Sequence, residues 1–328
     1  MDTARSAVDT ALTDPAAPAL MTTTTTTAAA AVASSATPPR RPGLLRRLGA
    51  QEDLNFLLTN RIPRIALTRL VGWYSQIRSP ALARVSIAVW RWFTDLDLSD
   101  AKKARFDSLH DCFTRELVPG ARPLDPDPAV FCSPSDAIVG ACGRIEAGQV
   151  WQAKGFPYTV ADLFGNAAAA RPFVDGSFVT LRLTSAMYHR FHAPQAGTVT
   201  GVRYIDGDTW NVNPIALKRV ERLFCRNVRA VIDLRLDQGG HRVALVPVAA
   251  VLVASLRLHC LDVLLRVRHR GANEFALSAH VERGQEMGWF QHGSTIIVFV
   301  PPGFTLAEGI EPGRQLRMGQ ALLRLPSA

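Results

Sequence analysis

Residues 284–300, GQEMGWFQHGSTIIVFV, hold the pattern from which the rest of the chain can be interpreted. The run Thr295–Val300 is rich in β-branched residues and is bounded by glycine and proline, which predicts a buried strand. Gly293 and Ser294 place a small nucleophile at the mouth of that strand, where glycine allows the backbone a strained or closely packed geometry. An isolated Gly-Ser pair is more often an ordinary turn, so the pair alone does not establish a catalytic serine.

Strand-like runs of the same kind recur from about residue 129 onward. The runs at 178–181 and 228–234 are bounded by Gly, Pro or Asp, and the valine-rich stretch 243–256 predicts a buried strand or a strand pair. Helices are expected at 101–117 and 159–165. The fold is therefore expected to be α+β and mostly β, with a β-rich catalytic domain and a helical N-terminal appendage.

The appendage is predicted from residues 54–94, which indicate two or three amphipathic basic helices punctuated by Pro63 and Pro80. Arginines and tryptophans are interleaved with the apolar residues. This fits a membrane-docking element with aromatic rings at headgroup depth and arginines on phosphates. Ordinary helices packed on the domain, with their arginines in water, explain the pattern equally well. No segment reaches the about 20 continuous apolar residues that a helix needs to span a bilayer.

Residues 1–40 contain a threonine run, an alanine run and two adjacent prolines. Such a composition buries too little apolar surface to offset the entropy of ordering, so it predicts a disordered low-complexity tail. The segment lacks the charged start and continuous apolar stretch of a signal peptide. The predicted organisation is a tail at 1–40, a basic amphipathic helical region at 41–100 and the catalytic domain at 101–328.

Composition narrows the classes of partner. The 328 residues include 48% hydrophobic residues, enough for a sizeable core, and the formal net charge is +9. A basic chain is attracted to nucleic acid or to an anionic membrane surface. No RRM, KH or helix-turn-helix pattern, which would favour nucleic acid, is found. The five cysteines are odd in number and form no CxxC pair, which argues against a disulfide framework and a zinc site, so no metal is expected.

Three further polar residues could act with Ser294. His189 and His192 lie three residues apart in YHRFHAP (188–194), and histidine is the usual proton carrier near neutral pH. Asp136 ends the turn-like segment SPSD (133–136), where an acid could orient a histidine as in hydrolase triads. The commoner alternatives are one core and one surface histidine, and an aspartate that caps a turn. Asp136, His192 and Ser294 supply the parts of a triad, but their spacing does not show that they meet.

Nine short motifs follow one another along the chain. They are FTREL (113–117), PGARP (119–123), SPSD (133–136), QAKG (152–155), YHRFHAP (188–194), VNP (212–214), LFCRN (223–227), GQEMG (284–288) and GST (293–295). Each motif alone is weak, but their order and spacing together are highly specific. Taken together, they resemble a known family, the type I bacterial phosphatidylserine decarboxylases. The likeness covers about residues 54–325.

The resemblance implies a proenzyme that cuts its own backbone. His192, oriented by Asp136, would deprotonate Ser294, and the serine oxygen would attack the carbonyl of Gly293 to give an ester. Elimination and hydrolysis would release ammonia. They would leave a β chain that ends at Gly293 and an α chain, 294–328, that begins with a pyruvoyl group made from Ser294.

The implied reaction is decarboxylation of phosphatidylserine to phosphatidylethanolamine and CO2, in phospholipid biosynthesis, through a Schiff base on the pyruvoyl group. His189 matches the family position of the proton donor. The implied cofactor is the covalent pyruvate itself. The expected substrate partner is phosphatidylserine in an anionic membrane. The β and α chains are expected to form a heterodimer, and a higher oligomer is left open. No nucleic acid is expected as a partner. The expected location is peripheral, on the cytoplasmic side of the cell membrane.

Several positions depart from the family pattern. His292 precedes the GST motif where leucine is usual, and Ala137 follows Asp136 where glycine is usual. Val228 replaces the glutamate of an Asn-Glu-Arg motif, and alanines replace glycines expected within 246–256. None of these residues belongs to the proposed triad. His292 and Ala137 nevertheless adjoin it, so they bear on the rate of processing.

Three other functions remain open from the residues alone. A serine hydrolase with the same triad would keep an intact chain, although no Gly-x-Ser-x-Gly elbow is present. A non-enzymatic basic module that binds anionic surfaces would not need Ser294. A family member that no longer processes is disfavoured because Asp136, His192 and Ser294 are all present.

Overall fold

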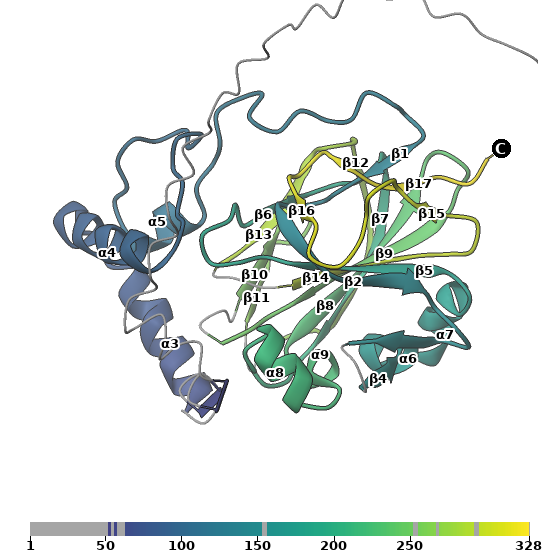
Figure 1. Ribbon diagram of the computed structural model, residues 1–328, viewed down its shortest axis with the longest axis horizontal. Coiled ribbons are helices and arrows are strands. Elements are labelled where there is room, and N and C mark those ends of the chain that lie inside the picture. Colours follow the sequence, from purple (N-terminus) through teal and green to yellow (C-terminus); the bar gives the residue numbers. More distant parts are fainter. Residues whose placement is uncertain are drawn as a thin grey trace, which may run out of the picture. The chain divides into compact units, whose positions relative to one another are not determined.

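The computed structural model describes residues 52–53, 56–57, 63–152, 156–251, 255–266, 269–291 and 295–327. The predicted tail at 1–40 lies outside these residues, as do Gly293, Ser294 and His292. The described part of the chain is rich in strands and has few helices, which confirms the predicted α+β, mostly β fold (Figure 1).

The largest element is an eight-stranded antiparallel sheet with the order β12-β7-β8-β9-β14-β5-β2-β16. Its strands are β2 (Ala137–Arg144), β5 (Ser177–Arg182), β7 (Gly197–Ile205), β8 (Arg229–Leu236), β9 (Arg242–Val248), β12 (Glu274–Val281), β14 (Thr295–Val300) and β16 (Gln315–Leu316). The interior strand β14 is the TIIVFV run, and every residue in it is buried. Its side chains alternate between two hydrophobic cores on opposite faces of the sheet, which explains why both faces of this strand are apolar.

The first core lies between the main sheet and a four-stranded sheet of order β11-β10-β13-β6. These strands are β6 (Arg190–His192), β10 (Ser255–Leu258), β11 (Leu264–Arg266) and β13 (Glu286–Phe290). A small sheet of β1 (Val130–Cys132), β17 (Ala321–Arg324) and β15 (Thr305–Leu306) adds to the same core. The stretch 243–256 thus supplies strands of two different sheets, β9 and the start of β10.

The second core lies between the other face of the main sheet and short helices. These are α6 (Val160–Phe164), α7 (Ala167–Ala170), η1 (Arg171–Phe173), α8 (Pro214–Arg219) and α9 (Leu223–Arg226). A hairpin of β3 (Gln149–Trp151) and β4 (Pro157–Thr159) completes this side. Helix α6 matches the helix expected at 159–165. It begins at Thr159, whose hydroxyl accepts from the backbone N–H of Asp162, and ends at Gly165.

The N-terminal helices are α3 (Arg64–Ser75) and α4 (Pro80–Phe93), as the pattern within 54–94 predicts. Helix α4 begins where it does because the Ser79 hydroxyl accepts from the N–H of Leu82 and Pro80 occupies the first turn. Helix α3 is tied to the β-rich part by Arg64, which forms an ion pair with Asp208 (2.6 Å) and lies over the ring of Trp210. No helix in the described ranges is long and apolar enough to cross a bilayer.

The helix predicted over 101–117 is mostly wrong, because only α5 (Leu109–Phe113) forms. The Ser108 hydroxyl accepts from the N–H of Asp111 and starts the helix there, and Thr114 closes it through the carbonyl of His110. Ala101 and Leu117, at the two ends of the predicted span, pair instead as an isolated antiparallel bridge. Local side-chain hydrogen bonds therefore outweigh the helical pattern over most of this segment.

Candidate active site

The imidazole of His192 is held at both ring nitrogens. His192 ends β6, where it pairs with Glu286 of β13. Its Nδ1 lies 2.8 Å from the carbonyl oxygen of Gly284, and its Nε2 lies 3.0 Å from the hydroxyl of Tyr188. A carbonyl can only accept, so Nδ1 carries the proton in this arrangement and Nε2 accepts from Tyr188. The neutral ring therefore presents the lone pair of Nε2.

Gly284 can offer this carbonyl because of its backbone conformation. It lies in the turn between β12 and β13 with φ of +80°, a region that residues with a Cβ rarely adopt. A Cβ at this position would also approach the side chain of Leu124 to 2.7 Å. Glycine at 284 therefore serves the orientation of His192.

Burial lowers the pKa of His192 below its ordinary value of 6.5, and the contact with Gly284 only partly opposes that shift. A neutral imidazole in a dry setting with an available lone pair is suited to accept a proton near pH 7. The local geometry thus fits His192 as a general base.

The resemblance implies that Asp136 contacts His192, but the carboxylate of Asp136 binds other groups in the structure. Its carboxylate accepts three contacts from Arg122, at 2.6, 2.8 and 3.1 Å, and one from the backbone N–H of Met318 at 2.9 Å. Arg122 also donates to Asp100 and lies 6.0 Å from the ring centre of Tyr188. Asp136 and His192 share no hydrogen bond, although the structure describes both. Among the charges near His192, Glu286 raises its pKa most, Arg190 opposes that effect, and Asp136 raises the pKa by a smaller amount.

His189 lies deeper than His192 and has no exposed surface. Its ring packs on Phe113 of α5, with the ring centres 3.9 Å apart, and Phe113 in turn stacks on Trp90 of α4. An aromatic column thus joins this histidine to the N-terminal helices.

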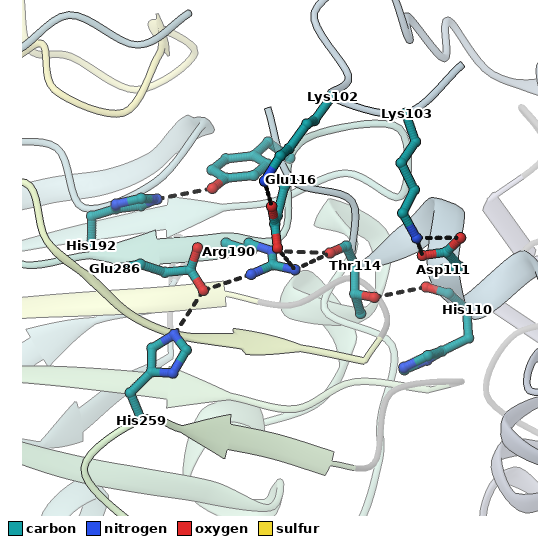
Figure 2. Close-up of polar contacts among 11 residues, drawn as sticks. Lys102, Lys103, His110, Asp111, Thr114, Glu116, Arg190, His192, His259 and Glu286 are labelled. Atoms are coloured by element: carbon teal, nitrogen blue, oxygen red, sulfur yellow. Dashed lines mark hydrogen bonds and ion pairs between the residues drawn. The ribbon is translucent and has the colours of Figure 1, made fainter. Parts of the chain in front are cut away.

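A cluster of three polar side chains, Arg190, Glu286 and His259, holds β6 beside β13. Arg190 donates to Glu286 at 2.7 Å, and Nε2 of His259 lies 2.8 Å from the same carboxylate oxygen. Arg190 also donates twice to the carbonyl of Thr114, just after α5 (Figure 2). These contacts join the histidine-bearing strand to its neighbour and to the segment that follows α5.

The start of β14 lies beside the end of β5. Thr295 is fully buried and pairs with Arg182 of β5 and with Val248 of β9. Its hydroxyl has no hydrogen-bond partner among the residues that the structure describes. Ser294 precedes Thr295 directly in the chain, and His189 follows the end of β5 after six residues.

A cavity of about 570 Å³ opens between the N-terminal helices and the main sheet. Apolar side chains form most of its wall, and they include Trp90, Phe113 and Leu183. Phe113 therefore contacts the cavity and the ring of His189 at once.

Comparison with known proteins gives this arrangement a family. Residues 109–324 match the family model described as "Phosphatidylserine decarboxylase". A phosphatidylserine decarboxylase proenzyme of Pseudomonas fluorescens is 38% identical over 283 residues, covering 81% of this chain and 96% of the relative. The proenzyme of the same name from Myxococcus xanthus is 35% identical over 278 residues, covering 82% and 98%. The chain belongs to the phosphatidylserine decarboxylase family.

Membership in the phosphatidylserine decarboxylase family confirms the resemblance drawn from the motifs and makes the chain an enzyme of a carboxy-lyase family. Three residues of the site had no role assigned from sequence: Arg122, Tyr188 and Gly284. All three lie in motifs that carry the resemblance, namely PGARP, YHRFHAP and GQEMG. The motifs indicate which segments contribute to the site, but their spacing does not reveal that His192 contacts the backbone carbonyl of Gly284.

Proposed function

We propose that this chain cuts itself between Gly293 and Ser294 and then decarboxylates phosphatidylserine to phosphatidylethanolamine. The observation that carries the proposal is the neutral, doubly held ring of His192, in a chain of the phosphatidylserine decarboxylase family. In the proposed scheme this ring is the base that acts on Ser294.

In the maturation step, Nε2 of His192 takes the proton of the Ser294 hydroxyl as the serine oxygen attacks the carbonyl carbon of Gly293. The amide bond between the two residues breaks and an ester bond forms. Loss of the Gly293 carboxylate by elimination leaves dehydroalanine, which hydrolyses to a pyruvoyl group and ammonia. Asp136 aids this step through its charge, which favours the imidazolium that His192 becomes.

The site suits a pyruvoyl group at position 294. The hydroxyl of Thr295, which has no partner in the described part of the chain, is a donor next to that position. Such a group supplies an electron sink for the loss of CO2. His189 holds the proton that is delivered after CO2 leaves, and its burial against Phe113 keeps water from that proton.

The two product chains are expected to stay together. The short chain begins at 294 and carries β14, which lies between β9 and β5 inside the main sheet. Cutting one peptide bond before this strand leaves its pairings on both sides intact. The mature form is therefore proposed as a heterodimer of a β chain and an α chain.

The proposed location is peripheral, on the cytoplasmic side of the cell membrane, and the surface of the N-terminal helices supports contact with a membrane. Helices α3 and α4 expose large apolar side chains, which are Leu70, Trp73, Val85, Val89, Trp92 and Phe93. The chain as a whole carries a net charge of +9. Exposed tryptophans on a basic protein favour binding to the interface of an anionic bilayer, where phosphatidylserine resides.

The decisive experiment is an intact mass spectrum of the purified full-length protein under denaturing conditions. Two fragments that split between Gly293 and Ser294, with the smaller one lighter by the conversion of serine to pyruvoyl, are the expected result. Ser294→Ala and His192→Ala should each give a single uncut chain without decarboxylase activity. A folded wild-type chain of full mass would contradict the proposal and favour a hydrolase that keeps its backbone intact.

A further inference from the structure

The cavity between the N-terminal helices and the main sheet contains one charged side chain among its described lining residues, that of Arg182. Arg182 is the last residue of β5 and pairs across the sheet with Thr295. Its aliphatic stem passes over Gly140 of β2, where an added Cβ would lie 3.0 Å from Cδ of Arg182. Glycine at 140 therefore leaves room for this arginine to lie along the sheet toward the cavity.

No described residue forms a hydrogen bond or an ion pair with the guanidinium of Arg182. The cavity wall contains no aspartate or glutamate among the described residues that form it. Burial lowers the pKa of Arg182, but an arginine keeps its charge near neutral pH. A partly buried cation that faces an apolar cavity, with no counter-charge among the described residues, favours an anionic ligand that enters the cavity.

Resting on the function proposed above, we propose that Arg182 binds the phosphodiester of the substrate headgroup and thereby fixes its orientation at the reaction centre. Guanidinium groups match phosphate oxygens in a bidentate manner, and such charge-assisted contacts are strong in an apolar setting. The pairing of Arg182 with Thr295 puts the backbone of this residue at the strand end next to position 294, while its side chain extends over β2 to the cavity.

The substrate also carries a carboxylate. The charge changes during the reaction indicate whether Arg182 binds the carboxylate or the phosphodiester. Negative charge leaves the carboxylate as CO2 departs, so a cation bound there would stabilise the ground state more than the transition state and would slow the reaction. The charge on the phosphodiester does not change during the reaction. Binding it lowers KM and leaves kcat nearly unaffected, so a cation at the phosphate does not oppose catalysis.

The test compares Arg182→Gln and Arg182→Lys with a matched control, Arg235→Gln, which removes an exposed arginine of β8 outside the cavity. Each protein is first checked for the two-chain form by mass. Decarboxylation is then measured in mixed micelles as a function of the mole fraction of phosphatidylserine. Arg182→Gln should raise the apparent KM about tenfold or more with kcat changed less than threefold, and Arg182→Lys should fall between it and wild type. Arg235→Gln should match the wild type.

Two soluble inhibitors separate the anions. Glycerophosphoethanolamine carries the phosphodiester without a carboxylate, and O-acetylserine carries the carboxylate without a phosphate. Arg182→Gln should weaken inhibition by the first and leave inhibition by the second unchanged.

Three results would overturn the assignment. The first is weakened inhibition by O-acetylserine alone together with a raised kcat, which would place Arg182 on the carboxylate. The second is an unchanged KM, and the third is failure of both Arg182 variants to be cut, which would place the residue in maturation. A wild-type chain that is uncut or inactive would refute the proposed function instead, so the two failures are distinguishable.

Discussion

Nδ1 of His192 donates to the carbonyl oxygen of Gly284 across 2.8 Å. This contact selects the tautomer in which Nε2 is the proton acceptor, and it fixes the plane of the ring. A backbone carbonyl in a glycine turn here makes the contact to Nδ1 that a carboxylate makes in many serine-based sites. Asp136 remains near enough to act through its charge while its oxygens bind Arg122 and the N–H of Met318.

The first prediction concerns the pH dependence of self-cleavage. Burial lowers the pKa of His192 below 6.5, so the neutral base persists to lower pH than for an exposed histidine. The cleavage rate constant should be near its plateau at about pH 8, should remain above half of that plateau at pH 6.5, and should pass through half only at lower pH. Freshly translated protein, followed by the appearance of the small chain on gels, gives the profile. His280→Ala, which removes an exposed histidine, should leave it unchanged. A half-maximal rate at pH 6.5 or above would contradict a lowered pKa.

The second prediction is that Tyr188→Phe still cuts itself at least as fast as the wild type. The Tyr188 hydroxyl occupies the lone pair of His192 Nε2, and the serine must take that place during proton transfer. Phenylalanine keeps the buried ring, while Gly284 still orients the imidazole. The fraction of cut chain against time measures this, with His192→Ala as the uncut reference. An uncut Tyr188→Phe protein would show that the phenol takes part in the transfer.

The third prediction separates two ways in which Asp136 could act. If Asp136 acts through its charge on His192, Asp136→Asn should slow self-cleavage, whereas Arg122→Met, which keeps that charge and removes the cation paired with it, should not. Both partners are nearly buried, so removing either charge should lower the free energy of unfolding by roughly 3 kcal/mol. Unfolding is best compared in a Ser294→Ala background, where every variant is a single chain. Equal slowing by Asp136→Asn and Arg122→Met would instead show that Asp136 acts through its ion pair with Arg122.

The sequence predicts those parts of the fold that depend on side-chain character along a strand. The run TIIVFV is apolar on both faces because β14 borders two cores, and its composition alone indicates this. The span 101–117 was overestimated as a helix because the hydroxyls of Ser108 and Thr114 confine the helical turn to a few residues. Such competition between local hydrogen bonds and periodicity is not visible in the hydrophobic pattern.

In the candidate site, too, the sequence predicts which residues are involved but not which contacts they make. The motif YHRFHAP located both histidines, yet their partners, Gly284 and Phe113, are 92 residues downstream of His192 and 76 residues upstream of His189. One partner contributes only its backbone, which leaves no side-chain signature beyond a glycine. Long-range contacts of this kind come from the pairing of β6 with β13 and from the docking of α5, which require the folded chain.

The fourth prediction assigns separate steps to the two histidines. His189→Ala should be cut into two chains as the wild type is, because Gly284 and Tyr188 hold the ring of His192 and both contacts remain in this variant. It should decarboxylate slowly, by a factor of about 100 or more, since a positioned proton donor contributes that much. Measuring both the mass of the chains and the release of CO2 is essential. Full turnover by the cut variant would remove His189 from the reaction, and an uncut chain would place it in maturation.

The last prediction concerns the exposed tryptophans of the N-terminal helices. Trp73 and Trp92 are 65% and 77% exposed, so replacing them with alanine should disturb the fold little. Each replacement should weaken binding to vesicles that contain phosphatidylserine several-fold, because an aromatic ring in the bilayer interface contributes to affinity. Raising the ionic strength should weaken the remaining binding, since arginines contribute through charge. Trp151→Ala is the matched control, because Trp151 is 50% exposed but lies in the β3 hairpin. Equal losses for all three variants, or none, would contradict docking through α3 and α4.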